Sequence, residues 1–370
     1  MKNAVLISCF NWYKTRVEPI RDLLLDCGYE TSVILSDFNH ITKKRLTKKN
    51  PDCYYIHVPS YEKNISLKRI QSHLFFGKET GFFLEQKKPD LIYLLLPPNN
   101  TAKYCSQYKK EHPDTKLIVD IIDLWPESMP IGLVKKTPIA WIWKKWRDDA
   151  LKKADYVFTE CNLYQDKLVN VLNLEKTSTL YLYKDRTEEE KQLIQEIVKN
   201  KKVDDGVIRF AYLGSMNNII DIDGICEVLK MYVRSGKICE VHAVGDGVSR
   251  KKFEQIVRNV GAKTYFYGPL FDEIEKIKIL APCDYAFNMM KKCVNVGLTI
   301  KSIDYLSYGL PLINSIKGDT WNLVDEQKIG FNFTGQILVS ENFDHNRILS
   351  VFENRFAKES FVRTVKTHLF

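Results

Sequence analysis

Short apolar runs alternate along the first half of the chain with segments in which apolar residues recur every three to four positions. Such runs are typical of strands buried in a parallel sheet, and the longer period is typical of covering helices. The predicted strands are Ala4–Cys9, Thr31–Leu35, Tyr54–Val58, Leu91–Leu95, Leu117–Ile122 and Tyr156–Thr159. The clearest helical periods are Val17–Cys27, Leu67–Leu84 and Pro138–Lys153. This alternation predicts βαβ units.

A charged segment, Lys184–Gly206, interrupts the pattern, and we predict a linker with a surface helix there. The strand pattern then restarts at Arg209–Leu213, Glu240–Val244, Thr264–Tyr267, Asp284–Met289 and Leu312–Asn314. A final helical segment, Ile348–Phe370, has no strand after it. The chain is therefore predicted to form two doubly wound α/β domains.

The composition is that of a soluble globular protein, with 45% hydrophobic and 27% charged residues among 370. The nine cysteines form no C-x-x-C pair, and the seven histidines show no metal-ligand spacing. This usage indicates free thiols in a reducing cytoplasm and argues against a zinc site. The start of the chain reads as a strand rather than a signal peptide, and no apolar stretch is long enough to span a membrane. A net charge of +9 favours an anionic partner: nucleic acid, a phosphate-rich ligand or a membrane face.

Two glycine-containing loops follow predicted strands of the second half. In "AYLGSMNN", Gly214 and Ser215 come directly after a strand and Asn217 lies in the same loop; "HAVGDG" contributes Gly245 and Gly247. Ligands of parallel sheets bind beyond the carboxyl ends of the strands, so these loops are candidate ligand contacts. Each loop taken alone is equally explained as a turn that uses glycine for a positive φ.

A helix start at "GLTIKSID" is a candidate anion site. If Thr299 caps this helix, the free N–H groups of the first turn, next to Leu298, suit a pyrophosphate. Lys301 adds a positive charge, and Asp304 lies one turn further on the same face, where a carboxylate can bind a ribose diol. The pattern indicates a nucleotide site. The alternative is a surface ion pair between Lys301 and Asp304.

The stretch "DIIDLWPES" follows a strand of the first half and carries Asp120, Asp123 and Glu127. In the functional interpretation, Asp123 or Glu127 orients or deprotonates an acceptor hydroxyl; in the structural one, the stretch is a capped turn. The loop after the first strand offers further candidate contacts to an acceptor or its phosphate, namely Asn11, Lys14 and Arg16.

A Trp-rich segment follows, with Trp141, Trp143 and Trp146 among basic residues. The simplest interpretation is a helix with a core-facing aromatic stripe and a solvated basic face. An interfacial membrane helix has the same composition, and so has a surface for single-stranded nucleic acid. No RNA-binding signature accompanies the segment, and we predict no nucleic-acid partner. Its basic residues are Lys135, Lys136, Lys144, Lys145 and Arg147.

Several of these segments, in this order and spacing, resemble glycosyltransferase family 4 of bacterial capsule, exopolysaccharide and O-antigen synthesis. "DIIDLWPESMP" resembles the D-x-W-P-E-S element of polysaccharide transferases, and "CGYETSVILSDFNH" resembles the family's second-strand segment. "FAYLGSMNNIIDIDG" and "VHAVGDGVSRKKFE" resemble the first two strand–loop segments of its nucleotide domain. "KSIDYLSYGLPLI" resembles the helix whose acidic residue holds the donor ribose. The resemblance covers nearly the whole chain.

This resemblance implies a GT-B fold of two Rossmann-like domains and a metal-independent hexosyltransferase without a cofactor. The implied reaction moves a sugar, with retention, from a UDP-sugar to a lipid-linked oligosaccharide at the inner face of the cytoplasmic membrane. The chain would then be a peripheral cytoplasmic protein, and its oligomeric state stays open. Asp123, Glu127 and Lys301 are the implied catalytic residues. The implied donor-binding residues are Gly214, Ser215, Asn217, Gly245, Gly247, Leu298, Thr299, Lys301 and Asp304.

The expected domains are 1–183 on the acceptor side, a linker at 184–206, and a nucleotide-sugar domain at 207–352. A helix at 353–370 is expected to cross back to the first domain, a trait of the resembled fold.

The chain departs from the family pattern at two positions. The first of two glutamates eight residues apart is replaced by Val296, and the second by Asp304. Asp223 stands where a lysine is common, so Lys291, Lys292 or Lys301 would have to supply the phosphate charge. The alternatives are a nucleotide-sugar 2-epimerase of the same fold and a non-catalytic partner subunit of another transferase.

Overall fold

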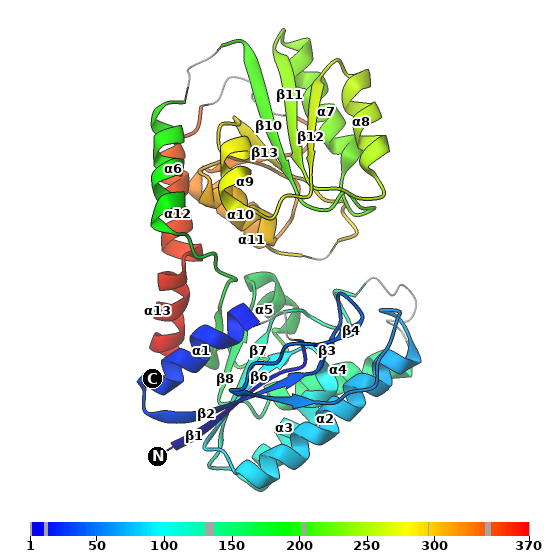
Figure 1. Cartoon of the computed structure of the whole chain (residues 1–370), viewed down its shortest axis with the longest axis vertical. Helices are drawn as coiled ribbons and strands as arrows, with labels where there is room; N and C mark the ends of the chain where they lie inside the picture. Colours follow the sequence, from blue (N-terminus) through cyan, green and yellow to red (C-terminus); the bar gives the residue numbers. More distant parts are fainter. Residues whose placement is uncertain are drawn as a thin grey trace. The chain divides into compact units, whose positions relative to one another are not determined.

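The computed structural model describes residues 2–10, 14–129, 137–201, 205–294, 296–336 and 342–369. The chain divides into two compact units: Met1–Tyr181 with Val362–Phe370, and Leu182–Phe361 (Figure 1). Within the described ranges, no helix combines the length and the apolar character needed to cross a membrane. Of the candidate acceptor contacts, Asn11 and the side chain of Lys14 lie outside the described residues. Lys135 and Lys136 of the Trp-rich segment also lie outside them.

The first unit contains a seven-stranded parallel sheet in the order β5-β2-β1-β6-β7-β8-β9. Its strands are β1 Lys2–Ser8, β2 Tyr29–Ser36, β5 Cys53–Ile56, β6 Leu91–Leu96, β7 Lys116–Ile121, β8 Tyr156–Thr159 and β9 Thr177–Thr179. A short antiparallel pair, β3 Phe38–Asn39 and β4 Lys44–Arg45, lies after β2. All six residues of β6 are buried, which explains why a continuous apolar run encodes this central strand.

The helices of the first unit connect these strands. They are α1 Lys14–Asp26, α2 Leu67–Lys87, α3 Asn99–Glu111, α4 Pro138–Leu151 and α5 Asn162–Leu168. The last helix, α13 Lys358–Leu369, begins in the second unit and belongs to the first from Val362 onward. Helices α2, α3 and α4 pack side by side, in that order (Figure 1). The end of α13 contacts strands of this unit: Lys116 Nζ donates to the carbonyl of Leu369 at 2.9 Å, and the His368 ring stacks on Tyr156.

The second unit contains a six-stranded parallel sheet in the order β12-β11-β10-β13-β14-β15. Its strands are β10 Val207–Leu213, β11 Ile238–Val244, β12 Lys263–Gly268, β13 Tyr285–Asn288, β14 Leu312–Asn314 and β15 Gly330–Asn332. Its helices are α6 Glu188–Lys199, α7 Ile222–Arg234, α8 Arg250–Asn259, α9 Glu273–Leu280, α10 Ile300–Ser307, α11 Asp319–Gln327 and α12 His345–Phe356.

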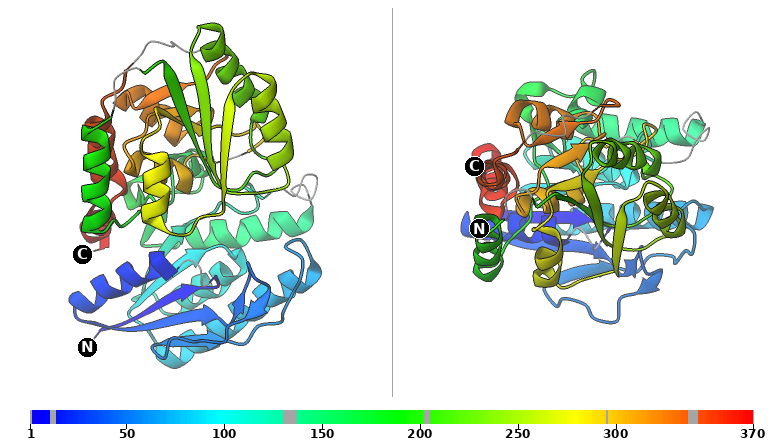
Figure 2. Two further views of the ribbon diagram at one scale, coloured as in Figure 1. Left: turned by 45° about the horizontal axis from the view of Figure 1, so that its top comes forward. Right: turned by 90° about the horizontal axis from the view of Figure 1, so that it is seen from above.

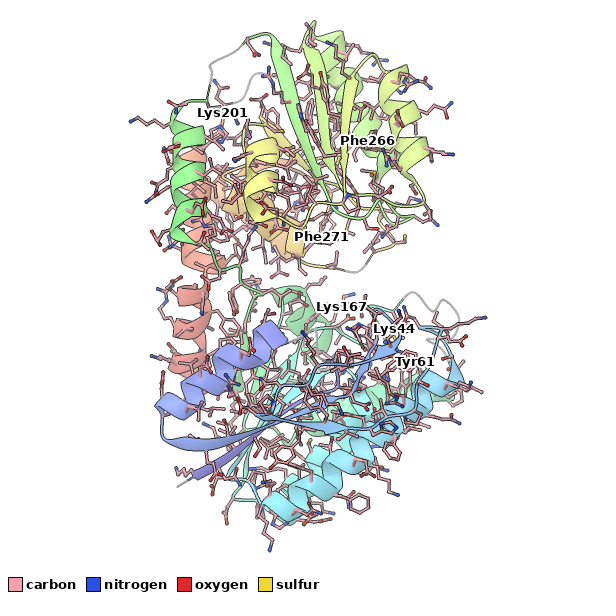
Figure 3. All side chains as sticks on the ribbon, viewed as in Figure 1. Lys44, Tyr61, Lys167, Lys201, Phe266 and Phe271 are labelled. Carbon is pink, nitrogen blue, oxygen red and sulfur yellow. The ribbon has the colours of Figure 1, made fainter. Side chains whose placement is uncertain are left out.

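Helices cover both faces of this second sheet. Helices α7 and α8 pack on one face of β10–β12, and α9 packs on the other (Figure 2). Side chains fill the space between each sheet and its helices (Figure 3). At the centre of the sheet, the rings of Phe210 and Phe287 stack with centroids 4.9 Å apart, which joins β10 to β13. The prediction of two doubly wound α/β units with parallel sheets is confirmed.

Candidate functional site

The strand order of the second unit indicates a candidate ligand site. Counted along the chain within this sheet, the order is 3-2-1-4-5-6, and it reverses between β10 and β13. Ligands of such sheets bind beyond the carboxyl ends of the strands at this switch point. The two glycine loops, after β10 and β11, and the segment that leads from β13 into α10 all begin at these ends.

The two glycine loops are held together by their backbones. The Gly214 N–H donates to the Val244 carbonyl and the Met216 N–H to the Asp246 carbonyl, each at 2.9 Å. Gly245 has a φ of +135°, and a Cβ there would overlap the Gly214 carbonyl oxygen. The glycine therefore permits a close backbone approach in addition to the turn.

Ser215 and Asn217 occupy the first of these loops. Ser215 is exposed, and its carbonyl accepts a hydrogen bond from Tyr212 Oη at 3.1 Å. The Asn217 side chain accepts from the Ile219 N–H at 3.0 Å and so stabilises the turn. Gly214 and Gly247 also have positive φ values, of +114° and +156°, so all three glycines of these loops lie at positions that favour glycine.

The predicted cap of α10 is confirmed. Thr299 is the N-cap residue, and its hydroxyl accepts from the Ser302 N–H at 3.2 Å, while Leu298 before it is buried. The Thr299 and Ser302 hydroxyls also contact Asn288 Oδ1, at 3.3 and 3.1 Å. The first turn of α10 is therefore tied to the end of β13.

Three asparagines at the ends of adjacent strands form a hydrogen-bonded chain, here called the asparagine ladder: Asn288, Asn314 and Asn332. They are paired in register on β13, β14 and β15. Asn288 Nδ2 donates to Asn314 Oδ1 at 2.9 Å, and Asn314 Nδ2 donates to Asn332 Oδ1 at 2.8 Å. Satisfied buried amides of this kind fix local geometry, so the ladder positions the start of α10. The ladder was not predicted, because the expected strand over Asp284–Met289 does not end in Asn and β15 was not expected at all.

Lys301 is a partly buried cation on the first turn of α10. Its Nζ lies 5.7 Å from the centre of the Tyr212 ring, on the strand that leads into the Gly214 loop. It forms no ion pair with any residue the structure describes, and burial lowers its pKa from 10.5 to about 8. A buried cation without a counter-ion, at the positive end of a helix, is arranged to receive an anion.

Asp304 lies next to a different cation from the one the sequence suggested. Lys184 Nζ donates to Asp304 Oδ1 at 2.7 Å and also binds Glu273. The alternative of a Lys301–Asp304 ion pair is therefore wrong: Asp304 pairs with Lys184. Because Lys184 precedes Asp304 by 120 residues, no local pattern could have indicated this contact.

Glu273 completes this group of charges. Tyr308 Oη donates to Glu273 at 2.6 Å, and Lys184 and Lys276 bind the same carboxylate. Burial alone would raise the pKa of Glu273, but these partners outweigh it and lower the pKa to about 2. Glu273 is thus a permanent anion that helps to hold Lys184 against Asp304.

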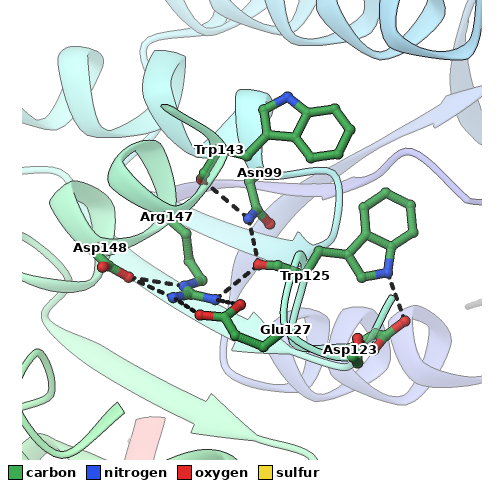
Figure 4. Close-up of polar contacts among 8 residues, drawn as sticks. Asn99, Asp123, Trp125, Glu127, Trp143, Arg147 and Asp148 are labelled. Carbon is green, nitrogen blue, oxygen red and sulfur yellow. Dashed lines mark hydrogen bonds and ion pairs between the residues drawn. The ribbon is translucent and has the colours of Figure 1, made fainter. Parts of the chain in front are cut away.

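In the first unit, Glu127 is held by a buried arginine (Figure 4). Arg147 forms two hydrogen bonds to the Glu127 carboxylate, at 2.7 and 3.0 Å, and also contacts Asp148. Its Nη1 donates to the Trp125 carbonyl at 2.8 Å. A carboxylate held in this way is a weak candidate for a base, because abstracting a proton would disrupt the pair.

Asp123 lies in the same turn and is better placed for acid–base chemistry. It accepts from Trp125 Nε1 at 2.8 Å and from the Ser128 hydroxyl. Burial raises its pKa, although these two hydrogen bonds act in the opposite direction. Asp120 serves structure instead, because Arg16 binds both of its oxygens at 2.8 Å. Arg16, predicted as a contact to the acceptor or its phosphate, is buried with its guanidinium on Asp120, which argues against that role.

The Trp-rich segment forms α4. The sequence predicted a core-facing aromatic stripe and a solvated basic face for this helix, and each prediction fails at one residue. Trp141 is 64% exposed, so it is not part of a core-facing stripe. Arg147 is completely buried, so it does not belong to a solvated basic face. Trp143 stacks on Trp125, with ring centroids 6.4 Å apart. The segment therefore presents both an aromatic ring and exposed lysines to solvent.

No protein-family model matches the sequence, and no curated protein matches it either. Solved structures do match over essentially the whole chain. Sucrose-phosphate synthase from Thermosynechococcus elongatus matches with a TM-score of 0.67 at 11% identity, covering 99% of this chain and 98% of the other.

Two further structures match similarly. The lipopolysaccharide outer core galactosyltransferase WaaB, in its apo form, matches with a TM-score of 0.64 at 14% identity. The Anabaena protein HepE, in complex with UDP and glucose, matches with a TM-score of 0.63 at 13% identity. Each alignment covers 100% of this chain and 99% of the other. Together with the two parallel sheets, these matches show that the chain has the GT-B glycosyltransferase fold.

Proposed function

We propose that this protein is a glycosyltransferase that moves a hexose from a UDP-sugar to a lipid-linked oligosaccharide in bacterial surface-polysaccharide synthesis. The GT-B fold supports a nucleotide-sugar donor, and a structure of this fold, HepE, contains UDP and glucose. The donor is assigned to the second unit, at the carboxyl ends of β10, β11 and β13. Retention at the anomeric carbon rests on the resemblance to family 4.

The observation that carries this proposal is Lys301. A partly buried ammonium without an ionic partner in the described chain, on the first turn of α10, matches the charge of a diphosphate. As the sugar–phosphate bond breaks, negative charge grows on the leaving diphosphate. Lys301 and the free N–H groups of the α10 N-terminus would stabilise that charge, and stabilisation of this type is usually the largest catalytic contribution.

The role of Asp304 in this proposal is to bind the ribose while Lys184 holds its Oδ1 oxygen. A carboxylate can accept several hydrogen bonds, so a ribose hydroxyl can share it with Lys184. In the first unit, Asp123 would orient the acceptor hydroxyl. Glu127 would act through Arg147, which anchors the turn that carries Asp123.

A titration with UDP and a panel of nucleotide sugars tests the donor site. We expect Asp304→Ala to weaken UDP binding by about 1.5–3 kcal/mol, the range for hydrogen bonds to a charged group. Calorimetry on the wild type and the variant measures this difference, and hydrolysis of the donor without an acceptor reports turnover. Equal affinities for the two proteins would remove Asp304 from the site.

The same experiment separates the alternatives. Interconversion of two UDP-sugars in the absence of acceptor would identify a 2-epimerase. Tight UDP binding without donor hydrolysis or transfer would support a non-catalytic partner subunit, for which Val296 in place of a glutamate is the motivating residue.

Helix α4 supports a peripheral position on an anionic membrane face. Trp141 and Lys144 are exposed on α4, and a basic residue near an anionic leaflet contributes about 1 kcal/mol before screening. We expect the protein to sediment with anionic but not neutral liposomes at low salt. The double variant Trp141→Ser with Lys144→Glu should stay in the supernatant and keep its UDP affinity. Equal sedimentation of variant and wild type would exclude α4 as the membrane contact.

A further inference from the structure

The first unit contains a pocket, here called the arginine pocket, whose described lining residues all belong to this unit. It lies between the start of α2, the turn after β7 and the start of α4. Most of its wall is apolar. The apolar wall consists of Ile65, Ile70, Met129, Ile139, Ala140 and Trp143. Such a wall suits a hydrocarbon better than a free sugar, whose hydroxyl groups need many polar partners.

Among the described lining residues of this pocket, Arg69 alone carries a positive charge. The Arg69 guanidinium lies 4.7 Å from the centre of the Trp125 ring and 5.8 Å from that of Tyr61, which is labelled in Figure 3. Its Nη1 donates to the Asn64 carbonyl at 2.6 Å, and its buried Nε has no hydrogen-bond partner among the described residues. The nearby Asp123 already accepts hydrogen bonds from Trp125 and Ser128. Arg69 thus retains a donor and a charge for an incoming anion.

A buried histidine lies beside this arginine. His73 is only 4% exposed and lines the same pocket, and within the described parts of the chain its Nε2 has no hydrogen-bond partner. Burial and the charge of Arg69 lower the pKa of His73 well below its ordinary value, so the ring is neutral. Buried polar groups without partners are rare in folded proteins, so these two groups are available to form hydrogen bonds to a ligand. A neutral imidazole can donate one hydrogen bond to a phosphate oxygen.

We propose that the arginine pocket binds the phosphate ester of a long hydrocarbon chain, with the phosphate at Arg69 and His73 and the hydrocarbon along the apolar wall. Ile65 and Ile139, which are 63% and 47% exposed, extend the apolar surface at the rim. The inference rests on the proposed function, because it assigns the lipid-phosphate part of the acceptor to the first unit. A free phosphate would contact Arg69 but not the apolar wall. A neutral lipid would contact the wall but give Arg69 no counter-ion. A ligand that has both a phosphate and a hydrocarbon therefore fits the pocket best.

Three probes titrated into the full chain test the proposal: farnesyl phosphate, farnesol and inorganic phosphate. Tryptophan fluorescence reports binding, because Trp125 and Trp143 line the pocket. We expect farnesyl phosphate to bind at least tenfold more tightly than either of the other two. Arg69→Met should lower the affinity for farnesyl phosphate at least tenfold and leave that for farnesol unchanged. Lys68→Met removes the same charge from an exposed position of α2 and should bind like the wild type.

Several results would overturn this assignment. Inorganic phosphate that binds as tightly as farnesyl phosphate would indicate a free-phosphate site, and farnesol that binds as tightly would exclude the anion site. Ile139→Glu at the exposed rim should weaken farnesyl phosphate but not inorganic phosphate, so it tests the wall even if Arg69→Met fails to fold. A UDP titration of the same samples keeps the two proposals separate, since failure to bind UDP counts against the donor site alone.

Discussion

Lys301→Met should weaken UDP binding by about 2–5 kcal/mol, because removing one member of a buried charge pair leaves the other desolvated and unpaired. This corresponds to a loss of affinity of roughly 30-fold or more. Methionine keeps most of the apolar stem that packs near Tyr212, so the variant isolates the charge. Calorimetric titration with UDP measures the change. The control is Lys251→Met, which removes a charge from an exposed position on α8 of the same unit.

The same variant should raise the stability of the ligand-free protein. Burial lowers the pKa of Lys301 from 10.5 to about 8, so the folded state disfavours the charged amine. Between about pH 8 and pH 10.5, the unfolded chain therefore binds more protons than the folded one, and wild-type stability rises with pH across this window. Lys301→Met should lack that rise and unfold at a higher temperature at pH 7.

UDP affinity of the wild type should fall above pH 8, as the amine loses its charge. A pH-independent affinity between pH 7 and 9.5 would contradict this role of Lys301.

Gly245→Ala should destabilise the second unit by about 2–6 kcal/mol. The residue has a φ of +135°, and the added Cβ would overlap the carbonyl oxygen of Gly214. Backbone strain and overpacking each cost about 1–3 kcal/mol. Hydrogen exchange of peptides from β10 and β11 measures the loss and assigns it to this unit. UDP binding should disappear with it, because both glycine loops move apart.

Gly261→Ala is the matched control for this substitution. Gly261 also has a positive φ, of +88°, but a Cβ there would meet nothing within 4 Å. Only the left-handed backbone cost of about 1–2 kcal/mol remains. If the two alanine variants showed equal losses of protection, close approach of the two loops could not be the reason for glycine at position 245.

The sheets could be predicted from the sequence because nearly every central strand is a continuous apolar run. Helix α3 was not predicted, because its buried positions include Asn99, Thr101 and Cys105, which give little hydropathy signal. The edge strands β9 and β15 were also missed. Each has three residues, and none of them is fully buried.

The site was predictable where it depends on neighbours in sequence and not where it depends on distant residues. The Thr299 cap and the glycine turns follow from local chemistry, and the structure has them as expected. Contacts such as Arg147 with Glu127 and Lys184 with Asp304 join residues 20 and 120 positions apart. Only the folded chain brings these charges together, so a sequence pattern could name the carboxylates but not their partners.

The asparagine ladder restricts how this sequence can diverge. Its amides point in one direction, from Asn288 through Asn314 to Asn332, and the last donates to the carbonyl of Trp321. An aspartate at the middle position has the same shape but cannot donate, and a leucine there would leave Asn288 Nδ2 without its acceptor and Asn332 Oδ1 without its donor. Single replacements therefore pass through a less stable intermediate. Over evolutionary time the three positions are bound to change together or to stay as they are, and homologous sequences should show them as a covarying set.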